Sequence, residues 1–330
     1  MLCAVSDIIK SETIEGEISN WKALRPREGG SYMIKDLCKE VLCLLLCLIV
    51  VGALHGAMAD TVFARYVWKG EKAKTVRQYE SDSLCYTIQR LQIKQTTCYV
   101  TNVWMKDPGR QVRKVNALWG EHLATPAALA KRVPEAAIVI NGSGYINRTY
   151  PEIPDSYPGQ SPDYYNTSYG SFVMTDGEIL RNLEDVPFYG VVLNADGLSM
   201  YAGVSSEDIL ETDPISTWSF YDKCALIENY EPIVDTAWDF AQHKATRTIL
   251  ACIDRNNYVV LTATNNSGMR LTTATDYLME TFHPVWAFNL DGGPSSALLA
   301  WKKGTQRLGA VFGGEKKDFD ILCFCVLTDN

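Results

Sequence analysis

The chain has 330 residues, of which 47% are apolar and 21% charged, and this composition excludes an intrinsically disordered protein. Its formal net charge of -8 argues against the basic surface of a nucleic-acid-binding protein. Four histidines in the whole chain argue against a multi-histidine metal site.

The first distinctive segment is an uncharged run of nineteen residues, 41–59, which is long enough to be weighed as a membrane helix. Lys35 and Lys39 precede it, and it closes on Ala-Met-Ala at 57–59, the small-x-small pattern of a signal-peptide cleavage site. The sequence therefore predicts a secretory signal peptide at 33–59. An uncleaved membrane anchor is the alternative, because neighbouring acidic residues offset both lysines.

A signal that begins at Met33 places the mature start at Asp60 and leaves residues 1–32 as a surplus upstream extension. Codons for Glu-Gly-Gly at 28–30 can spell a ribosome-binding site just before the Met33 codon. We therefore expect a bacterial gene with a start assigned too far upstream, and a secreted or cell-envelope protein.

Six cysteines remain after residue 60. Export permits disulfides, and Cys85 with Cys98 is the candidate pair, with two free thiols as the open alternative. Cys323 and Cys325 alternate with apolar residues and are predicted to lie on one core face of a strand. No CxxC pair occurs, which argues against structural zinc.

The predicted elements follow the apolar periodicity and the turn residues along the chain. They are two strands within 86–104 (the second at 98–104), a helix at 119–132, a buried central strand at 136–140, a loop at 155–170, hairpins at 172–180, 188–201 and 248–263, a helix at 272–282, and strands at 285–290, 297–301 and 319–326. Hairpins with few helices predict a single α+β domain with an antiparallel or mixed β-sheet core. We expect 60–135 to form its N-terminal part and 136–330 its core.

Three segments place polar residues and glycines at the ends of apolar strands, where side chains are commonly delivered to a site. They are Asn-Gly-Ser-Gly-Tyr at 141–145, Thr-Arg-Thr at 246–248, and Asn-Leu-Asp-Gly-Gly-Pro-Ser-Ser at 289–296. In the last segment, Asp291 shares a face with Asn289, and the following two glycines and two serines could form a nest for an anionic oxygen. A tight turn capped by Asp291 explains the same residues.

The other two segments are equally open on local grounds. Asn141 and Gly142 tolerate positive φ, so a plain turn explains them as well as a site does. Arg247 could be solvated, or it could grip a phosphate through two parallel hydrogen bonds.

Together the three segments resemble the phosphodiester glycosidases, whose pattern is a strand ending in N-G-G-[YF]-F, then R-T before a hairpin, then a helix and N-L-D-G-G-G-S. The resemblance covers roughly 136–326. The chain departs from the pattern at Ser143, Ile146 and Pro294, and these departures bear on substrate preference more than on membership of the family.

The resemblance implies hydrolysis of a sugar 1-phosphodiester at the bond between the anomeric carbon and a phosphate oxygen. That chemistry needs a grip on the phosphate and a carboxylate near the anomeric carbon. We predict three catalytic residues: Asp291 as the carboxylate, Arg247 as part of the grip, and Asn141 as a hydrogen-bonding residue. The predicted substrate-binding or phosphate-binding residues are Gly292, Gly293, Ser295, Ser296, Asn289, Thr248, Gly142 and Tyr145.

Two features of this prediction stay open. The second carboxylate is not identified, and Asp239 is a weak candidate. Four tyrosines could stack on sugar faces or pack locally: Tyr157, Tyr164, Tyr165 and Tyr169.

Several other functions compete with the hydrolase. The main alternative is a non-catalytic glycan-binding or envelope-assembly protein on the same scaffold. A serine hydrolase using Ser143 or Ser295 lacks a G-x-S-x-G motif. No cofactor or metal is predicted, although loop carboxylates leave calcium open. The expected partner is a carbohydrate or sugar-phosphate substrate, not nucleic acid, with a membrane contact only through an uncleaved N-terminal segment.

Overall fold

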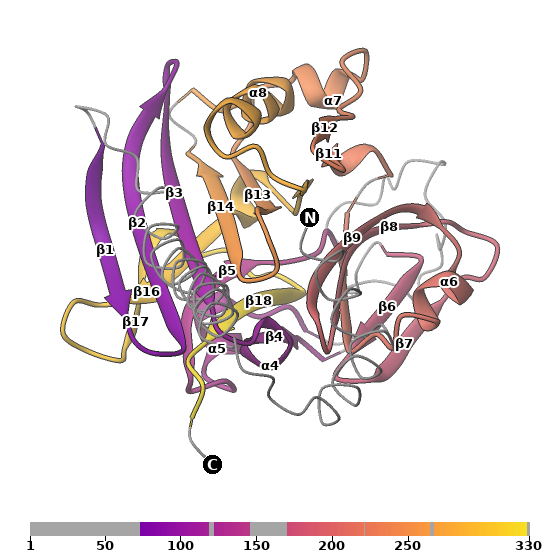
Figure 1. Cartoon of the computed structure of the whole chain (residues 1–330), viewed down its shortest axis with the longest axis horizontal. Coiled ribbons are helices and arrows are strands. Elements are labelled where there is room, and N and C mark those ends of the chain that lie inside the picture. Colours follow the sequence, from indigo (N-terminus) through magenta and orange to yellow (C-terminus); the bar gives the residue numbers. More distant parts are fainter. Residues whose placement is uncertain (1–72, 119–121, 146–169, 221, 265–266, 329–330) are drawn as a thin grey trace, which may run out of the picture. The chain divides into compact units, whose positions relative to one another are not determined.

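The computed structural model describes residues 73–118, 122–145, 170–220, 222–264 and 267–328. They belong to one compact unit, Arg65–Asn330 (Figure 1). The predicted signal peptide and the four loop tyrosines lie outside the described residues. Among the described helices, none has the length and apolar character needed to cross a bilayer.

The larger sheet has eight strands in the order β1-β2-β3-β14-β13-β15-β11-β12. Its members are β1 (Lys74–Glu80), β2 (Leu84–Ile93), β3 (Thr96–Met105), β11 (Ala225–Glu228), β12 (Glu231–Pro232), β13 (Arg247–Cys252), β14 (Asn257–Ala263) and β15 (Trp286–Asn289). All neighbouring strands in this sheet pair antiparallel. Figure 1 shows β1, β2 and β3 as three long curved strands side by side, with β14 and β13 next to β3.

A second sheet has five strands in the order β17-β16-β5-β18-β4, again all antiparallel. Its members are β4 (Val112–Asn116), β5 (Ala136–Asn141), β16 (Ala297–Trp301), β17 (Leu308–Gly313) and β18 (Asp320–Cys325). Every residue of β5 is buried, so the predicted central strand is confirmed.

The remaining elements are short. They are the hairpin β6 (Phe172–Thr175) with β7 (Glu178–Asn182), the small sheet β10-β8-β9 (Ser216–Ser219, Phe188–Asn194, Gly197–Val204), the helices α4 (Pro108–Gln111), α5 (Pro126–Ala130), α6 (Ser206–Leu210), α7 (Asp239–Gln242) and α8 (Leu271–Thr281), and the 3₁₀ turns η3 (Asp222–Cys224) and η4 (Gly293–Ser295). The Asp176-Gly177 turn has positive φ at both residues, as a two-residue hairpin turn requires.

The two large sheets pack face to face because each strand alternates apolar side chains between two cores. In β13, Leu250 joins the core between the sheets, whereas Ile249 faces a second core under α8. In β18, Leu322 joins the core between the sheets, whereas Cys323 and Cys325 face a third core with α5. The predicted placement of these two cysteines on one buried strand face is confirmed.

Antiparallel pairing brings several strand ends to one edge. The end of β5 lies beside the start of β18, since Asn141 pairs with Ile321. The end of β15 lies beside β13, since Asn289 pairs with Ile249. The segment between β15 and β16 then connects the eight-stranded sheet to the five-stranded one.

The predicted antiparallel sheet core with few helices is confirmed for the described residues. They are mostly β-strand, so the helical part of the predicted α+β domain is small. The hairpins, the helix α8 and the strands β15, β16 and β18 agree with prediction within a few residues. The helix predicted at 119–132 is wrong in its extent, because α5 begins only at Pro126, after the cap Thr125. Proline disfavours helical geometry in the residue before it, so the helix cannot extend backwards.

The predicted disulfide between Cys85 and Cys98 is also wrong, since both are free thiols. In the β2–β3 hairpin Cys98 pairs with Leu91, and Cys85 pairs with Trp104. The two cysteines are therefore about 20 Å apart along the strands at ~3.3 Å per residue. A disulfide requires Cα atoms within about 7 Å.

Candidate functional site

The three segments singled out in the sequence come together through main-chain hydrogen bonds. The amide of Asp291 donates to the carbonyl of Gly142 over 3.1 Å, and the amide of Gly293 donates to the carbonyl of Thr246 over 2.9 Å. A third bond joins the amide of Leu290 to the carbonyl of Thr248. The segment 289–296 thus lies between the end of β5 and the start of β13.

Asn141 ties this junction together through its side chain, which is fully buried. Its Nδ2 donates to the carbonyl of Asp291 at 2.7 Å. Its Oδ1 accepts from the Thr248 hydroxyl at 2.8 Å and from the amide of Ala297 at 2.9 Å. Asn141 and Thr248 therefore position the Asp291 main chain, and a contact of either with a ligand stays a prediction.

The turn after β5 is held by a carboxylate that the sequence analysis missed. Asp320 Oδ1 accepts from the Ser143 amide, and its Oδ2 accepts from the Ser143 hydroxyl at 2.8 Å. Lys114 Nζ lies 3.1 Å from Oδ2, and both side chains of this ion pair are fully buried. A side chain at Gly142 would collide with Asp320 and Trp218, so this position needs glycine. The Ser143 hydroxyl serves this carboxylate and not a histidine, which speaks against Ser143 as a nucleophile.

Asp291 itself is half-buried. Its Oδ1 accepts from the amide of Gly292 at 2.7 Å. Burial raises the pKa of Asp291 to about 6, although the Ser295 hydroxyl and the Gly292 amide oppose the rise. A carboxyl group poised near neutral pH can act as an acid or a base.

The predicted anion nest at Gly292 and Gly293 is not formed. The Gly292 amide is used by Asp291 itself, and the Gly293 amide is used by Thr246. Because both amides already donate to acceptors within the chain, they are not available to an anionic ligand. The capped-turn alternative describes this stretch better.

Arg247 also differs from the expected phosphate grip. Its side chain is 1% exposed. Nη2 donates to the carbonyls of Phe240 and His243 at 2.7 and 2.9 Å, and Nε donates to the carbonyl of Met269. The guanidinium also lies over the Phe240 ring at 4.2 Å, and burial lowers the pKa of Arg247 to about 10. These contacts join β13 to α7, so this arrangement does not favour Arg247 as a phosphate ligand.

The other predicted binding residues fall into two groups. Tyr145 and Ser295 belong to the first group. The Tyr145 hydroxyl donates to the carbonyl of Lys317 at 3.0 Å, and the Ser295 hydroxyl lowers the pKa of both Tyr145 and Asp291. Asn289 lies in the core, where its Nδ2 donates to the carbonyl of Leu290. The Ser296 hydroxyl is buried and has no hydrogen-bond partner among the described residues.

Two charged residues missed by the sequence analysis complete the cluster. Lys316 is half-buried and places Nζ 5.3 Å from the centre of the Tyr145 ring. Asp318 is 2% exposed, and the charge of Asp291 acts on its pKa. The sequence did contain a signal for Asp318. Asp318 and Asp320 flank Phe319 at the start of an apolar strand, just as polar residues stand at the ends of the strands in the other three segments.

The weak candidate Asp239 is exposed at the start of α7, and none of its described interactions involves Asp291. The described residues contain no group of three histidine, cysteine, aspartate or glutamate side chains able to hold a metal ion. The expectation of no cofactor stays a prediction.

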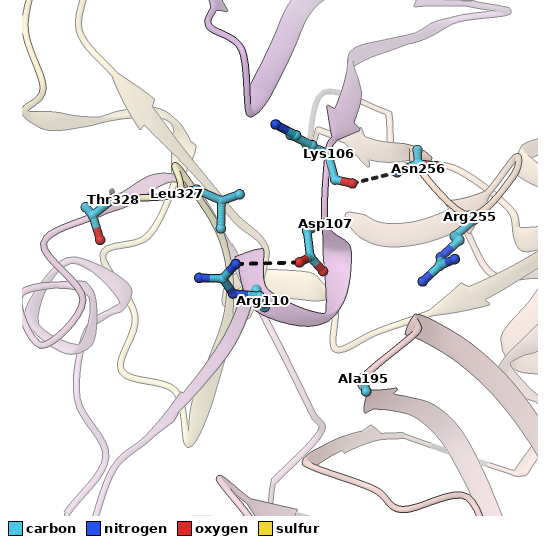
Figure 2. A pocket seen from close by; sticks show the side chains of 8 residues that line it. All are labelled: Lys106, Asp107, Arg110, Ala195, Arg255, Asn256, Leu327 and Thr328. Carbon is cyan, nitrogen blue, oxygen red and sulfur yellow. Dashed lines mark hydrogen bonds and ion pairs between the residues drawn. The ribbon is translucent and has the colours of Figure 1, made fainter. Parts of the chain in front are cut away.

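A separate hollow of about 670 Å³ is lined by none of the predicted site residues. Figure 2 shows Arg110 directed at Asp107, and this pair is 3.9 Å apart. Arg255 likewise pairs with Asp196 at 3.0 Å. Two of the three cations that line this hollow, Arg110 and Arg255, are therefore paired with carboxylates.

The chain matches one protein family and is similar in fold to known structures. The family model described as phosphodiester glycosidase matches residues 134–318, more than half of the chain. The catalytic domain of zebrafish N-acetylglucosamine-1-phosphodiester alpha-N-acetylglucosaminidase, auto-inhibited by its pro-peptide, is similar in fold, with a TM-score of 0.53 and 17% identity over 77% of this chain and 88% of that one. A hypothetical protein from Synechocystis aligns over 78% of this chain and 64% of its own length, with 14% identity and a TM-score of 0.49. Among curated proteins, no significant match is found.

Proposed function

The chain belongs to the phosphodiester glycosidase family, and from this premise we propose that it is an exported hydrolase of sugar 1-phosphodiesters. The bond cleaved is the one between the anomeric carbon and the phosphate oxygen. The observation that carries the proposal is the position of Asp291, half-buried where the three segments meet, with a pKa raised to about 6.

Asp291 supplies the carboxylate that this chemistry requires. Glycoside hydrolysis passes through a transition state in which the sugar carries positive charge. A carboxylate beside the anomeric carbon can stabilise this charge, can take a proton from the attacking water, or can itself attack the anomeric carbon. The pKa of Asp291 lets the ionised form dominate above about pH 6.

Lys316 is better placed than Arg247 to meet the phosphate. Burial works against its charge, but the Tyr145 hydroxyl and the neighbouring carboxylates leave its pKa raised above the ordinary lysine value. It therefore stays cationic, and its charge acts on Asp291. A lysine binds phosphate as a point charge.

The test is release of free sugar from sugar 1-phosphodiesters with an aryl phosphate leaving group. A panel of such substrates with several sugars is tested, and one of these sugars is N-acetylglucosamine, the sugar in the name of the zebrafish relative. The Asp291→Asn variant keeps the shape of the side chain and should lower kcat/KM by about 10²–10⁴-fold, the usual contribution of a positioned acid or base. Asp185→Asn, at an exposed position between β7 and β8, is the matched control and should leave the rate unchanged.

The glycan-binding alternative gives the opposite result. A wild-type protein that binds oligosaccharides but releases no sugar from any member of the panel would replace the hydrolase by a binding protein. Residues 33–59 support export, and envelope or extracellular glycans are the proposed source of substrate.

A further inference from the structure

Asp318 is a buried carboxylate, and its hydrogen bonds among the described residues are made by its main chain. Its amide donates to the carbonyl of Ala124 at 2.8 Å, and its carbonyl accepts from the Ala124 amide at 3.1 Å. The side chain is 2% exposed, and neither oxygen has a hydrogen-bond partner among the described residues. Leaving an ionised carboxylate so placed costs several kcal/mol.

The contrast with Asp320, two residues later, is informative. Asp320 is also fully buried, but its oxygens accept two hydrogen bonds from Ser143 and pair with Lys114. Such a carboxylate is satisfied and serves the fold. Asp318 has none of these partners, although it lies only two residues before Asp320, the first residue of β18. A residue kept for structure alone would be expected to have them.

The groups that face Asp318 disfavour a second negative charge. Burial and the charge of Asp291 raise the pKa of Asp318 to about 8, with a smaller rise from Asp320, and only Ser295 and Lys316 oppose this. The Ser295 hydroxyl acts on both Asp291 and Asp318, although it is not in hydrogen-bond geometry with Asp318. Main-chain contacts place the two carboxyl groups at one junction: the amide of Asp291 donates to the carbonyl of Gly142, and the amide of Gly142 donates to the carbonyl of Asp320, two residues after Asp318. Two neighbouring carboxyl groups in different environments separate into one base and one acid.

We propose that Asp318 is the second carboxylate of this site and the proton donor to the phosphate oxygen that leaves the anomeric carbon. The proposal rests on the hydrolase function proposed above. It assigns Asp291 as the ionised partner of Asp318 and Ser295 as the hydroxyl that acts on both carboxyl groups. Lys316 is the cation that offsets the negative charge of the leaving phosphate.

The step balances with water as the only co-reactant. A water oxygen forms the new bond to the anomeric carbon, and Asp291 takes one proton from this water. The bond from the anomeric carbon to the phosphate oxygen breaks with its electron pair on that oxygen, which receives the proton of Asp318. Asp291 then releases its proton to solvent and Asp318 takes one up from solvent, so both groups regain their starting states.

The experiment measures kcat/KM against pH for the wild type, Asp318→Asn and the control Asp185→Asn, with thermal unfolding of each. The wild type should show a bell-shaped profile that rises near pH 6 and falls near pH 8, as the pair loses its two protons in turn. Asp318→Asn should lose at least about 100-fold in rate, and its residual activity should no longer fall at alkaline pH. Asp185→Asn should keep the wild-type profile.

The outcomes separate this proposal from the proposed function. If Asp318→Asn stays folded, keeps the alkaline decline and loses less than about threefold in rate, against the 10²–10⁴ expected of a proton donor, Asp318 is not the donor even though the enzyme is a hydrolase. If the wild type cleaves no substrate, the hydrolase function fails first. An infrared band of a protonated carboxyl group at neutral pH, lost in Asp318→Asn, then decides the charge state separately, and its absence in the wild type would overturn the assignment.

Discussion

Asp318 couples activity to stability at the scale of a single side chain. In the unfolded chain its carboxyl group ionises near the ordinary value of 3.8, whereas in the folded protein burial and Asp291 raise its pKa to about 8. Between these values the folded state binds a proton that the unfolded state has lost. Stability is therefore highest below about pH 4 as far as this group is concerned, and it falls as pH rises toward 8.

Replacing Asp318 by asparagine should therefore stabilise the protein while it removes activity. The stabilisation should be small near pH 4 and grow toward pH 8, by at most about 1.4 kcal/mol for each pH unit. Denaturant unfolding of wild type and Asp318→Asn at several pH values measures the difference. A variant that is less stable than wild type at about pH 8 would show that Asp318 has partners that support the fold.

At the scale of elements, Arg247 is the link between β13 and α7. It starts β13, and its guanidinium satisfies three carbonyls, two of which belong to α7 and its C-terminal cap. A buried carbonyl left without a donor costs about 1–3 kcal/mol. The structural role therefore predicts a large loss of stability when the guanidinium is removed.

The Arg247→Ala variant should lower the free energy of unfolding by about 3 kcal/mol, through lost hydrogen bonds and the lost contact with Phe240. Urea unfolding measures this loss, and Arg270→Ala is the comparison, because among the described residues Arg270 donates one side-chain bond, to the carbonyl of Gln242, at an exposed site. If Arg247→Ala unfolds like wild type but no longer releases sugar, the guanidinium grips phosphate after all.

Elements with strong local signals could be predicted from the sequence. The hairpin at β6 and β7 has an Asp-Gly turn, and β5 and β18 are continuous apolar runs of strand length. The strands β1, β4 and β17 were missed because their sequences are polar or glycine-rich. β4 in particular carries the buried Lys114, whose charge is compensated by Asp320, more than two hundred positions away in the chain.

The candidate site was likewise predictable from the sequence only in part. The meeting of the three segments was predictable, since each combines glycine and polar residues at a strand end. The role of each side chain at this meeting point was not predictable, because the partners of Asn141, Arg247 and the two glycines come from other segments of the chain. Asp318 escaped notice since its importance lies in the partners that it lacks among the described residues, and no sequence pattern encodes this.

At the largest scale, the part of the chain that the structure describes is stabilised by packed sheets and contains no disulfide. Six cysteines lie within the described residues, and all six are free. Five of them are buried, and Cys85 is half-buried. Burial raises the pKa of Cys98 and of Cys252 to about 12, so these thiols are poor nucleophiles at neutral pH.

We therefore expect that a reducing agent does not change the midpoint of thermal unfolding. A Cys85→Ser variant should unfold with the wild type in both oxidised and reduced buffer, and a thiol reagent applied to the native protein should modify Cys85 before the five buried cysteines. Calorimetry and mass spectrometry of the labelled protein make these two measurements. If reduction lowered stability by about 2–4 kcal/mol, as loss of a native disulfide does, and Cys85→Ser reproduced the loss, Cys85 would be bonded in the native protein, and β2 would have to slide along β3 to bring Cys98 within reach.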